Sequence, residues 1–444
     1  KETADTCDSP NGTAGRRSDF YKDGDTCLEN PSQSGQKSCA RMYWERKEIM
    51  IICIDITEML NVEYITGIQR VVKEIAVRWI EERMELKLLS YDLKNKCFIE
   101  ADNHKFYNYY TGKNKNKKIL THRKMRIDDF NSQHLFFDID AVWMTPLKRS
   151  YLLPLLKSRG TGIAVFIHDI IPLTEPFYCH ETTVFWFLEY LGAHLTQADF
   201  VITSTQATIS VIETLLADIL PDRLHAQVVR LGSGFMKKEI TSDKLPVIRK
   251  HIMQVADGRK YVLMVGTLEP RKNHQFVLKA FEKSLFEDGI SLVLAGRTGW
   301  NIDTFVAYVR SHEQLGRKLY FIEDASDEEI AFLYKNALLV AFSSYNEGFG
   351  LPIIEALESG TIVLASDIPV LREAGGEYCT YFSLDDSSGF AELVREYSTD
   401  QKKWNDAKEK LKQYQSCSWE DCARNMQKAL YNNVNVKQEG WRTK

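Results

Sequence analysis

The amino-acid sequence predicts an α/β fold built from parallel sheets in two domains. The clearest observation is a strand–loop–helix–strand unit, in which apolar runs at Leu338–Phe342 and Thr361–Ala365 flank a short helix at Pro352–Ser359. A second apolar run, at 49–56, is followed by apolar residues at helical spacing. The third observation is length, because 444 residues of ordinary globular composition, 44% hydrophobic and 27% charged, correspond to two domains of common size.

Composition narrows the class of protein. The formal net charge of −4 gives no overall basic field for nucleic acid. No apolar run approaches the roughly 18 residues that a membrane-spanning helix needs. The nine cysteines are scattered and form no C-x-x-C pair, so we expect most of them to be reduced in a cytoplasmic protein. Cys7, Cys27 and Cys39 could pair or bind a metal, although no metal-ligand spacing supports this.

The first segment, residues 1–47, is polar and rich in Gly, Ser, Asp, Asn and Thr. It has almost no aliphatic residues with which to bury a core, and it lacks the apolar core of a secretory signal. We expect it to be flexible, as a linker or a tail.

The loop of the first unit combines two glycines, Gly348 and Gly350, with two carboxylates, Glu347 and Glu355. A helix N-terminus attracts phosphate through its free N–H groups, and glycine lets the backbone approach a ligand. A carboxylate would repel phosphate, so we expect each one to bind sugar hydroxyls beside a diphosphate. The alternative is a helix-start charge and a solvated helix residue. The glycines are not a dinucleotide fingerprint, because the third glycine is absent.

A family resemblance follows from these residues. Glu347 and Glu355 form an E-x7-E pattern within EGFGLPIIEALESG, which resembles the nucleotide-sugar signature of family-four retaining glycosyltransferases. The run VGTLEPRKN, residues 265–273, is similar to the diphosphate-binding turn of that family. The sequence of this run is especially similar to that of bacterial mannosyl- and rhamnosyltransferases of surface-polysaccharide assembly.

The resemblance implies the GT-B fold, in which two Rossmann-like domains face each other across a cleft and a C-terminal helix crosses back to the first domain. We therefore expect four segments after residue 47. They are an acceptor-side domain at 48–235, a linker at 236–259, a nucleotide-sugar-binding domain at 260–415, and a returning helix with a tail at 416–444.

In the predicted first domain, the segment T-G-I-Q-R, residues 66–70, lies between a strand and a helix. This order places backbone N–H groups toward a phosphate. The resemblance implies that Gly67 closes over the donor diphosphate, although the family often has two adjacent glycines here. Alternatively, Gly67 is a plain structural turn.

The strand predicted at Gly162–Ile167 ends at His168 and Asp169. Residues at the carboxyl ends of parallel strands face the ligand crevice, so both are placed for function. The resemblance implies that His168 lies beside the reacting sugar. The alternative is a buried, hydrogen-bonded histidine.

A basic segment lies between Lys105 and Arg126, with eight Lys or Arg residues and no acid. It could be a solvated loop. It could also be a peripheral contact with an anionic membrane surface or a lipid-diphosphate acceptor, because each basic residue near such a surface contributes about 1 kcal/mol.

In the predicted second domain, the turn at Gly266 and Thr267 leads to Arg271 and Lys272. Arginine binds phosphate in a bidentate way and lysine acts as a point charge, so we expect both to neutralise a diphosphate. They could instead be exposed loop cations. We also expect Asn273 to cap the following helix.

Taken together, these motifs predict a retaining, metal-independent hexosyltransferase. Mannose from GDP-mannose is the best candidate donor, and a glycan or lipid-linked saccharide is the acceptor. We expect no cofactor. The predicted catalytic residues are His168, Glu347, Arg271 and Lys272. The predicted donor-binding residues are Arg271, Lys272, Gly67, Gly266, Thr267, Glu347, Gly348, Phe349, Gly350, Leu351 and Glu355. The alternatives are another GT-B enzyme, such as a nucleotide-sugar epimerase, or a non-catalytic nucleotide-sugar-binding subunit.

Overall fold

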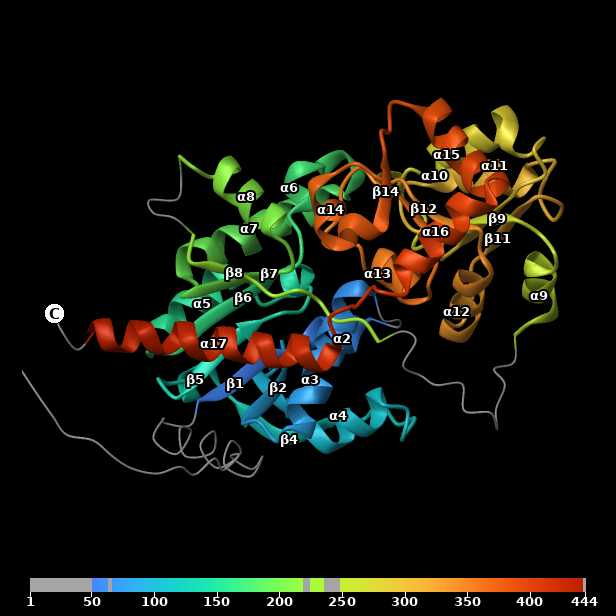
Figure 1. The fold of residues 1–444 in the computed structure, drawn as a ribbon. Coiled ribbons are helices and arrows are strands. Elements are labelled where there is room, and N and C mark those ends of the chain that lie inside the picture. Colours follow the sequence, from blue (N-terminus) through green and yellow to red (C-terminus); the bar gives the residue numbers. More distant parts are fainter. Residues whose placement is uncertain (1–49, 63–65, 219–223, 235–247, 442–444) are drawn as a thin grey trace, which may run out of the picture. The chain divides into compact units, whose positions relative to one another are not determined.

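The structure is a computed structural model that describes residues 50–62, 66–218, 224–234 and 248–441 (Figure 1). The expectation for residues 1–47 and the alternatives for Cys7, Cys27 and Cys39 therefore lie outside the described residues. Two separate sheets organise the described chain. Both are covered by helices, as an α/β fold requires.

The first sheet has the strand order β4-β3-β2-β1-β5-β6-β7-β8. Its strands are β1 (Ile51–Asp55), β2 (Leu86–Asp92), β3 (Cys97–Ala101), β4 (Leu120–Met125), β5 (His134–Asp138), β6 (Gly162–Ile167), β7 (Phe200–Thr203) and β8 (Ala226–Val228). Most neighbours are parallel, but β3 pairs antiparallel with both β2 and β4. The sequence did not indicate this antiparallel edge.

The helices of the first half follow the strands in the order expected of parallel crossovers. They are α2 (Thr57–Asn61), α3 (Gly67–Glu81), α4 (Asn103–Tyr110), α5 (Arg149–Ser158), α6 (Ile171–Thr174), α7 (Glu181–Gln197) and α8 (Gln206–Leu215). The Thr205 hydroxyl accepts a hydrogen bond from the Thr208 N–H and caps α8. Threonine is among the residues preferred at this cap position.

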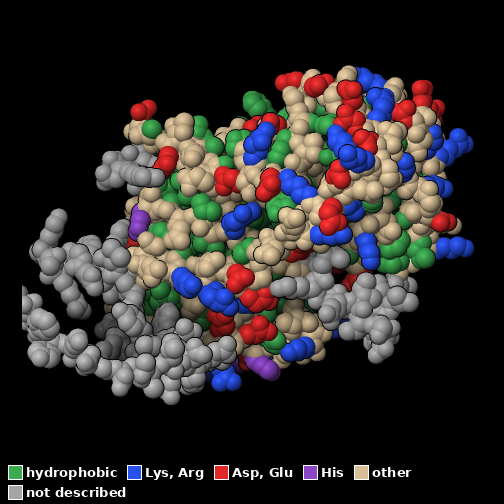
Figure 2. All heavy atoms as spheres, in the orientation of Figure 1, with side chains coloured by type: hydrophobic (Ala, Val, Ile, Leu, Met, Phe, Trp, Pro, Cys, Tyr) green, Lys and Arg blue, Asp and Glu red, His purple; other side chains and the backbone are tan. Residues whose placement is uncertain are grey.

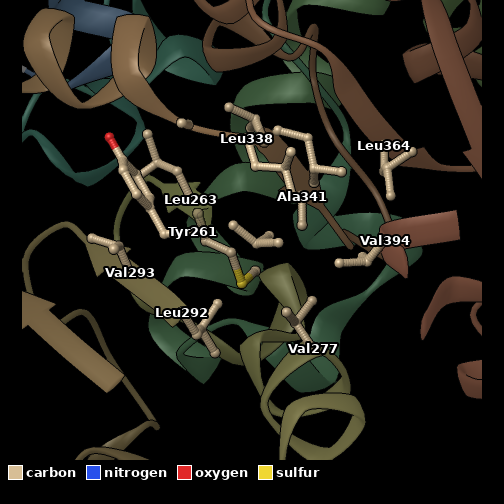
Figure 3. Close-up of a cluster of buried hydrophobic side chains, with 14 of the residues drawn as sticks. Tyr261, Leu263, Val277, Leu292, Val293, Leu338, Ala341, Leu364 and Val394 are labelled. Carbon is tan, nitrogen blue, oxygen red and sulfur yellow. The ribbon is translucent and has the colours of Figure 1, made fainter. Parts of the chain in front are cut away.

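The second sheet is parallel throughout, with the order β11-β10-β9-β12-β13-β14. Its strands are β9 (Tyr261–Val265), β10 (Ser291–Ala295), β11 (Leu319–Ile322), β12 (Leu339–Phe342), β13 (Val363–Ser366) and β14 (Cys379–Phe382). Figure 3 shows its core, where Leu263, Leu292 and Ala341 lie among helix side chains such as Val277. The near-continuous apolar strands reflect burial on both faces.

The second half contains nine helices among the described residues. They are α9 (Lys250–Ala256), α10 (His274–Ala280), α11 (Asp303–Ser311), α12 (Asp327–Asn336), α13 (Leu351–Glu358), α14 (Pro369–Gly375), α15 (Ser387–Thr399), α16 (Gln401–Leu411) and α17 (Trp419–Trp441). Helix α9 lies inside the segment predicted as a linker, and its Ile252 and Val255 pack into the core of the second sheet.

Helix α17 returns to the first sheet, as the resemblance implied (Figure 1). Its buried residues Trp419, Cys422 and Met426 belong to the same core cluster as Ile75 of α3. The indole N–H of Trp79 in α3 donates to the Ala423 carbonyl over 3.1 Å. The two sheets are therefore joined by packing as well as by the chain.

Figure 2 shows positive and negative side chains interspersed over one face of the molecule. Across the described part of the chain, no helix combines the length and the apolar character needed to cross a membrane.

Candidate functional site

A buried cluster of charges forms where β9 and β12 end. Arg271 and Lys272 lie in the short helical turn after β9, and Glu347 lies in the loop after β12. Oε1 of Glu347 is 2.9 Å from Nη1 of Arg271 and 2.8 Å from Nζ of Lys272. The side chains of Arg271 and Lys272 are only 12% and 13% exposed, so the alternative of exposed loop cations is wrong.

Glu347 is ionised in this environment. Burial alone would raise the pKa of its carboxyl, but the two cations and a 2.7 Å hydrogen bond from the Ser344 hydroxyl hold the pKa at about 2. The residue is 8% exposed, so it is not a solvated charge at a helix start. The carboxylate keeps both cations facing the same point of the cluster.

Two more carboxylates surround the cations. Glu269 accepts a hydrogen bond from Nη2 of Arg271 and is 3% exposed. Burial raises the pKa of Glu269, and it also raises the pKa of Asp169, although Arg271 opposes the shift in both cases. The functional prediction from the sequence did not include Glu269. The only local signal was its place beside the strand end, two residues before Arg271.

The glycine loop lies against His168. A Cβ on Gly348 would come within 2.7 Å of the His168 carbonyl oxygen, so only glycine fits this approach. Gly350 has φ of +93°, which also favours glycine. Phe349 is buried in the core cluster of the first domain, and Leu351 begins α13. The loop is therefore fixed between the two domains.

His168 follows β6, and its imidazole is hydrogen-bonded. Nε2 lies 2.7 Å from the Ile139 carbonyl oxygen and donates to it, which leaves Nδ1 as the acceptor nitrogen. Burial lowers the pKa of His168 to about 4, so the ring is neutral near pH 7. The hydrogen bond agrees with the alternative of a hydrogen-bonded histidine, while a place beside the reacting sugar stays a prediction.

Glu355 is 6% exposed, so it is not a solvated helix residue. Its Oε1 lies 2.5 Å from Nη1 of Arg70, and its Oε2 accepts a 3.3 Å hydrogen bond from the Tyr334 hydroxyl. Arg70 ends the segment that the sequence singled out around Gly67. No residue near Arg70 in the sequence indicates this ion pair, because its partner lies 285 residues away along the chain.

The structure does not require a glycine at position 67. Gly67 is exposed at the first position of α3, and a Cβ there would meet nothing within 4 Å. The three residues before Thr66 lie outside the described residues. Gly67 is therefore not brought into contact with the buried charge cluster.

The turn after β9 is shaped by backbone contacts. Gly266 has φ of +136°, and a Cβ there would lie 3.3 Å from Cε of Lys272. Thr267 is exposed. The prediction that Asn273 caps α10 with its side chain is wrong. Asn273 occupies the cap position in the left-handed conformation, with φ of 53°, and its side chain makes no capping hydrogen bond.

The first domain also contains buried charged groups that were not predicted from the sequence. Arg149 is buried between Asp55 and Asp138, with 2.8 Å from its Nη2 to Oδ2 of Asp55. Asp140 is fully buried and accepts hydrogen bonds from the N–H groups of Met59 and Ala141. Burial raises the pKa of Asp140 to about 7. Among the residues that the structure describes, no three His, Cys, Asp or Glu side chains form a metal-binding group.

Comparison with known proteins finds a family match for the second half of the chain. Residues 249–414 match the model of the family glycosyl transferases group 1. The chain is 27% identical over 361 residues to the serotype-specific mannosyltransferase WbdA of Escherichia coli, a match that covers 78% of this chain and 42% of WbdA. It is 28% identical over 270 residues to the O-antigen chain mannosyltransferase B of Escherichia coli, covering 60% of this chain and 69% of that protein.

Solved structures confirm the fold. HepE of Anabaena in complex with UDP and glucose gives a TM-score of 0.57 at 13% identity, covering 86% of this chain and 99% of HepE. Sucrose-phosphate synthase of Thermosynechococcus elongatus gives a TM-score of 0.60 at 16% identity, covering 87% of this chain and all (100%) of that chain. The chain thus has the two-domain GT-B fold.

The match to WbdA spans 42% of that protein's own length, so the comparison describes one part of a longer relative. Residues 249–414 match the glycosyl transferases group 1 family, and the chain is similar in sequence to bacterial mannosyltransferases.

Proposed function

We propose that the chain is a retaining glycosyltransferase that moves a hexose from a nucleoside diphosphate sugar to a hydroxyl of a glycan or lipid-linked saccharide. The observation that carries the proposal is the convergence of Arg271 and Lys272 on Glu347 in a buried site where β9 and β12 end. Ligands of open parallel sheets bind at this edge. The names of the mannosyltransferase relatives support a role in surface-polysaccharide synthesis.

In this reaction the bond between the sugar anomeric carbon and the diphosphate oxygen breaks, and a bond to the acceptor oxygen forms on the same face. The acceptor proton passes to the leaving phosphate, so no protein base is needed. Arg271 and Lys272 stabilise the charge that develops on the diphosphate. The N–H groups around Gly348 to Leu351 add partial positive charge.

The carboxylates bind the neutral parts of the donor. Glu347, ionised and fixed by two cations, accepts hydrogen bonds from sugar hydroxyls. Glu355 binds the ribose. The His168 loop lies against Gly348, which suits an imidazole that orients a donor hydroxyl through Nδ1. Thr267 and the Gly266 turn complete the donor site, and the Gly67 segment closes over the diphosphate.

Mannose is the first candidate sugar, because relatives that match 78% of this chain are named mannosyltransferases. GDP is the nucleotide that the resemblance favours, while the HepE complex holds UDP. The two cations supply the charge that a metal gives other transferases, so we propose transfer without an added metal or cofactor.

We further propose that the protein acts in the cytoplasm at the membrane surface. The basic segment 105–126 folds as α4 and β4, and most of its Lys and Arg side chains are exposed. Exposed cations of this kind attract anionic lipid headgroups.

The test is a panel of GDP- and UDP-sugars mixed with purified protein, with EDTA present, read by thermal shift and by release of nucleoside diphosphate. One donor should stabilise the fold and slowly release its diphosphate, and the anomeric configuration of the product should match that of the donor. Interconversion of a free donor without any acceptor would favour an epimerase. Donor binding without turnover on any acceptor would favour a non-catalytic subunit.

A further inference from the structure

A cavity lies beside the buried charge cluster. Its lining residues belong to the second domain, apart from Tyr178 of the first domain. It has a volume of about 590 Å³ and is bounded by α10, α11, Tyr178 and Tyr345. Glu269 belongs to both the cavity and the charge cluster, because it lines the cavity and forms an ion pair with Arg271. The predicted donor residues Arg271, Lys272 and Glu347 do not line it. A ligand here would therefore occupy a site of its own.

Aromatic rings dominate the mouth of the cavity. Tyr178 and Tyr345 stack with centroids 5.8 Å apart and planes 15° from parallel. Phe305 and Tyr308 of α11 form another wall. Tyr345 is 43% exposed and Tyr308 is 49% exposed, so these rings offer flat apolar faces to a ligand from solvent. Rings with one apolar face and one polar tip suit a ligand of mixed character.

The polar lining selects for hydroxyl groups rather than phosphates. Gln275, Asn301 and Thr304 supply amide and hydroxyl groups, while Glu269 and Glu282 supply carboxylates. Lys279 is the one Lys or Arg side chain that lines this cavity, and Glu269 is already paired with Arg271, so the lining carries little net charge. A single lysine is a weak phosphate site, whereas amides and carboxylates bind neutral hydroxyls well.

One buried polar atom at the cavity is unsatisfied. His274 lines the cavity and is 3% exposed, and its Nδ1 has no hydrogen-bond partner among the described residues. Buried polar atoms in native proteins nearly always have a partner, and each exception calls for an explanation. This nitrogen has almost no accessible surface, so it is not counted as a contact for a ligand in the cavity.

From the flat aromatic faces and the hydroxyl-binding lining together, we propose that this cavity binds a neutral saccharide. Its volume lies within the range of small-molecule sites. The saccharide could come from a distal part of the acceptor glycan, an assignment that rests on the proposed function, or from a separate free oligosaccharide. Because Glu269 lines the cavity, the bound sugar touches a group that positions Arg271.

The experiment measures binding without any donor, so its outcome is independent of transfer. Neutral manno- and gluco-oligosaccharides of one to six units are titrated into the full chain and followed by calorimetry and ligand-observed NMR. We expect at least one to bind, and Tyr308→Ala to weaken it about 10-fold, as loss of one aromatic contact can. Gln275→Ala, at an exposed position on the same cavity, should weaken it as well.

The matched control is Tyr151→Ala, which removes a tyrosine that is also exposed (62%) from α5 of the first domain. It should leave the affinity unchanged, and all three variants should keep the melting temperature of the parent. If no neutral oligosaccharide binds, or if Tyr308→Ala and Gln275→Ala bind as tightly as the parent, the proposal is overturned.

Steady-state kinetics with acceptors of different length then show whether the bound saccharide is part of the acceptor glycan or a separate oligosaccharide. A Tyr308→Ala protein with a raised KM for long acceptors, and an unchanged KM for short ones, identifies the ligand as part of the acceptor. Lost binding with unchanged acceptor kinetics identifies a separate oligosaccharide. Either result supports a saccharide site.

Discussion

Arg70 and Glu355 bind each other across the two domains, with 2.5 Å between Nη1 of the arginine and Oε1 of the carboxylate. Arg70 belongs to α3 of the first domain and Glu355 to α13 of the second. Burial raises the pKa of Glu355, and Arg70 opposes that shift. The carboxylate proposed to bind ribose therefore also links the domains, and donor binding must share it with Arg70.

The first prediction concerns this ion pair. Arg70→Met leaves a buried carboxylate without its cation, and an unsatisfied buried group costs about 1–3 kcal/mol. We expect the free energy of unfolding to fall by that amount in urea denaturation, with a changed KM for the donor. The control is Arg372→Met, which removes an exposed ion pair. The side chain of Arg372 is 55% exposed and that of its partner Asp367 is 45% exposed. It should cost less than about 1 kcal/mol. Equal losses in the two variants would contradict the prediction.

The second prediction concerns the charge cluster. Glu347→Gln and Arg271→Ala should each lower kcat by about 10²–10³-fold, as loss of one transition-state contact does in other enzymes. Steady-state release of nucleoside diphosphate measures this effect, and circular dichroism checks the fold. Arg310→Ala, which removes a surface ion pair to Glu323, is the matched control and should keep full activity. Near-normal turnover in both site variants would refute the site.

Local chemistry made part of this fold predictable from the sequence. Helix α12 begins where its sequence indicates, because Ser326 and Glu329 form a reciprocal capping box. Gly360 has φ of +66° directly after α13, as expected of a residue that ends a helix. The strand β6 stands out because its apolar residues are buried on both faces. In each case the signal lies within a few residues.

What the sequence did not reveal depends on distant partners. The antiparallel strands β3 and β4 have mixed composition, and only their pairing with β2 defines them. The strand β8 ends at Val228, and the chain beyond it pairs at Ser233 with Ser418 instead. The contact between Arg70 and Glu355 follows from the tertiary fold, because 285 residues separate them along the chain. The spacing of apolar residues along the sequence does not indicate such contacts.

The third prediction is a pH dependence of stability. Burial lowers the pKa of His168 to about 4 and that of His274 to about 3, while an unfolded imidazole has a pKa of about 6.5. Between these values the unfolded state binds more protons, so stability falls as the pH falls from about 6.5 toward 4. Urea denaturation at pH 7 and pH 5 should show this loss.

His168→Gln should remove part of that pH slope. His104→Gln, at an exposed position on α4, is its control and should keep the slope of the parent. A His168→Gln protein whose stability depends on pH as steeply as the parent's would contradict the assignment of the slope to this imidazole.

The last prediction compares two glycines. Gly348→Ala places a Cβ within 2.7 Å of the His168 carbonyl oxygen, so the loop or the strand end must shift. We expect a lower melting temperature and weaker donor binding. Gly67→Ala meets nothing within 4 Å and replaces glycine in a helix, which should stabilise the protein by about 0.5–1 kcal/mol. If Gly67→Ala is stable yet inactive, the backbone there must touch the donor. If it is stable and active, Gly67 only begins α3, and the donor site is confined to the His168 end of the first domain.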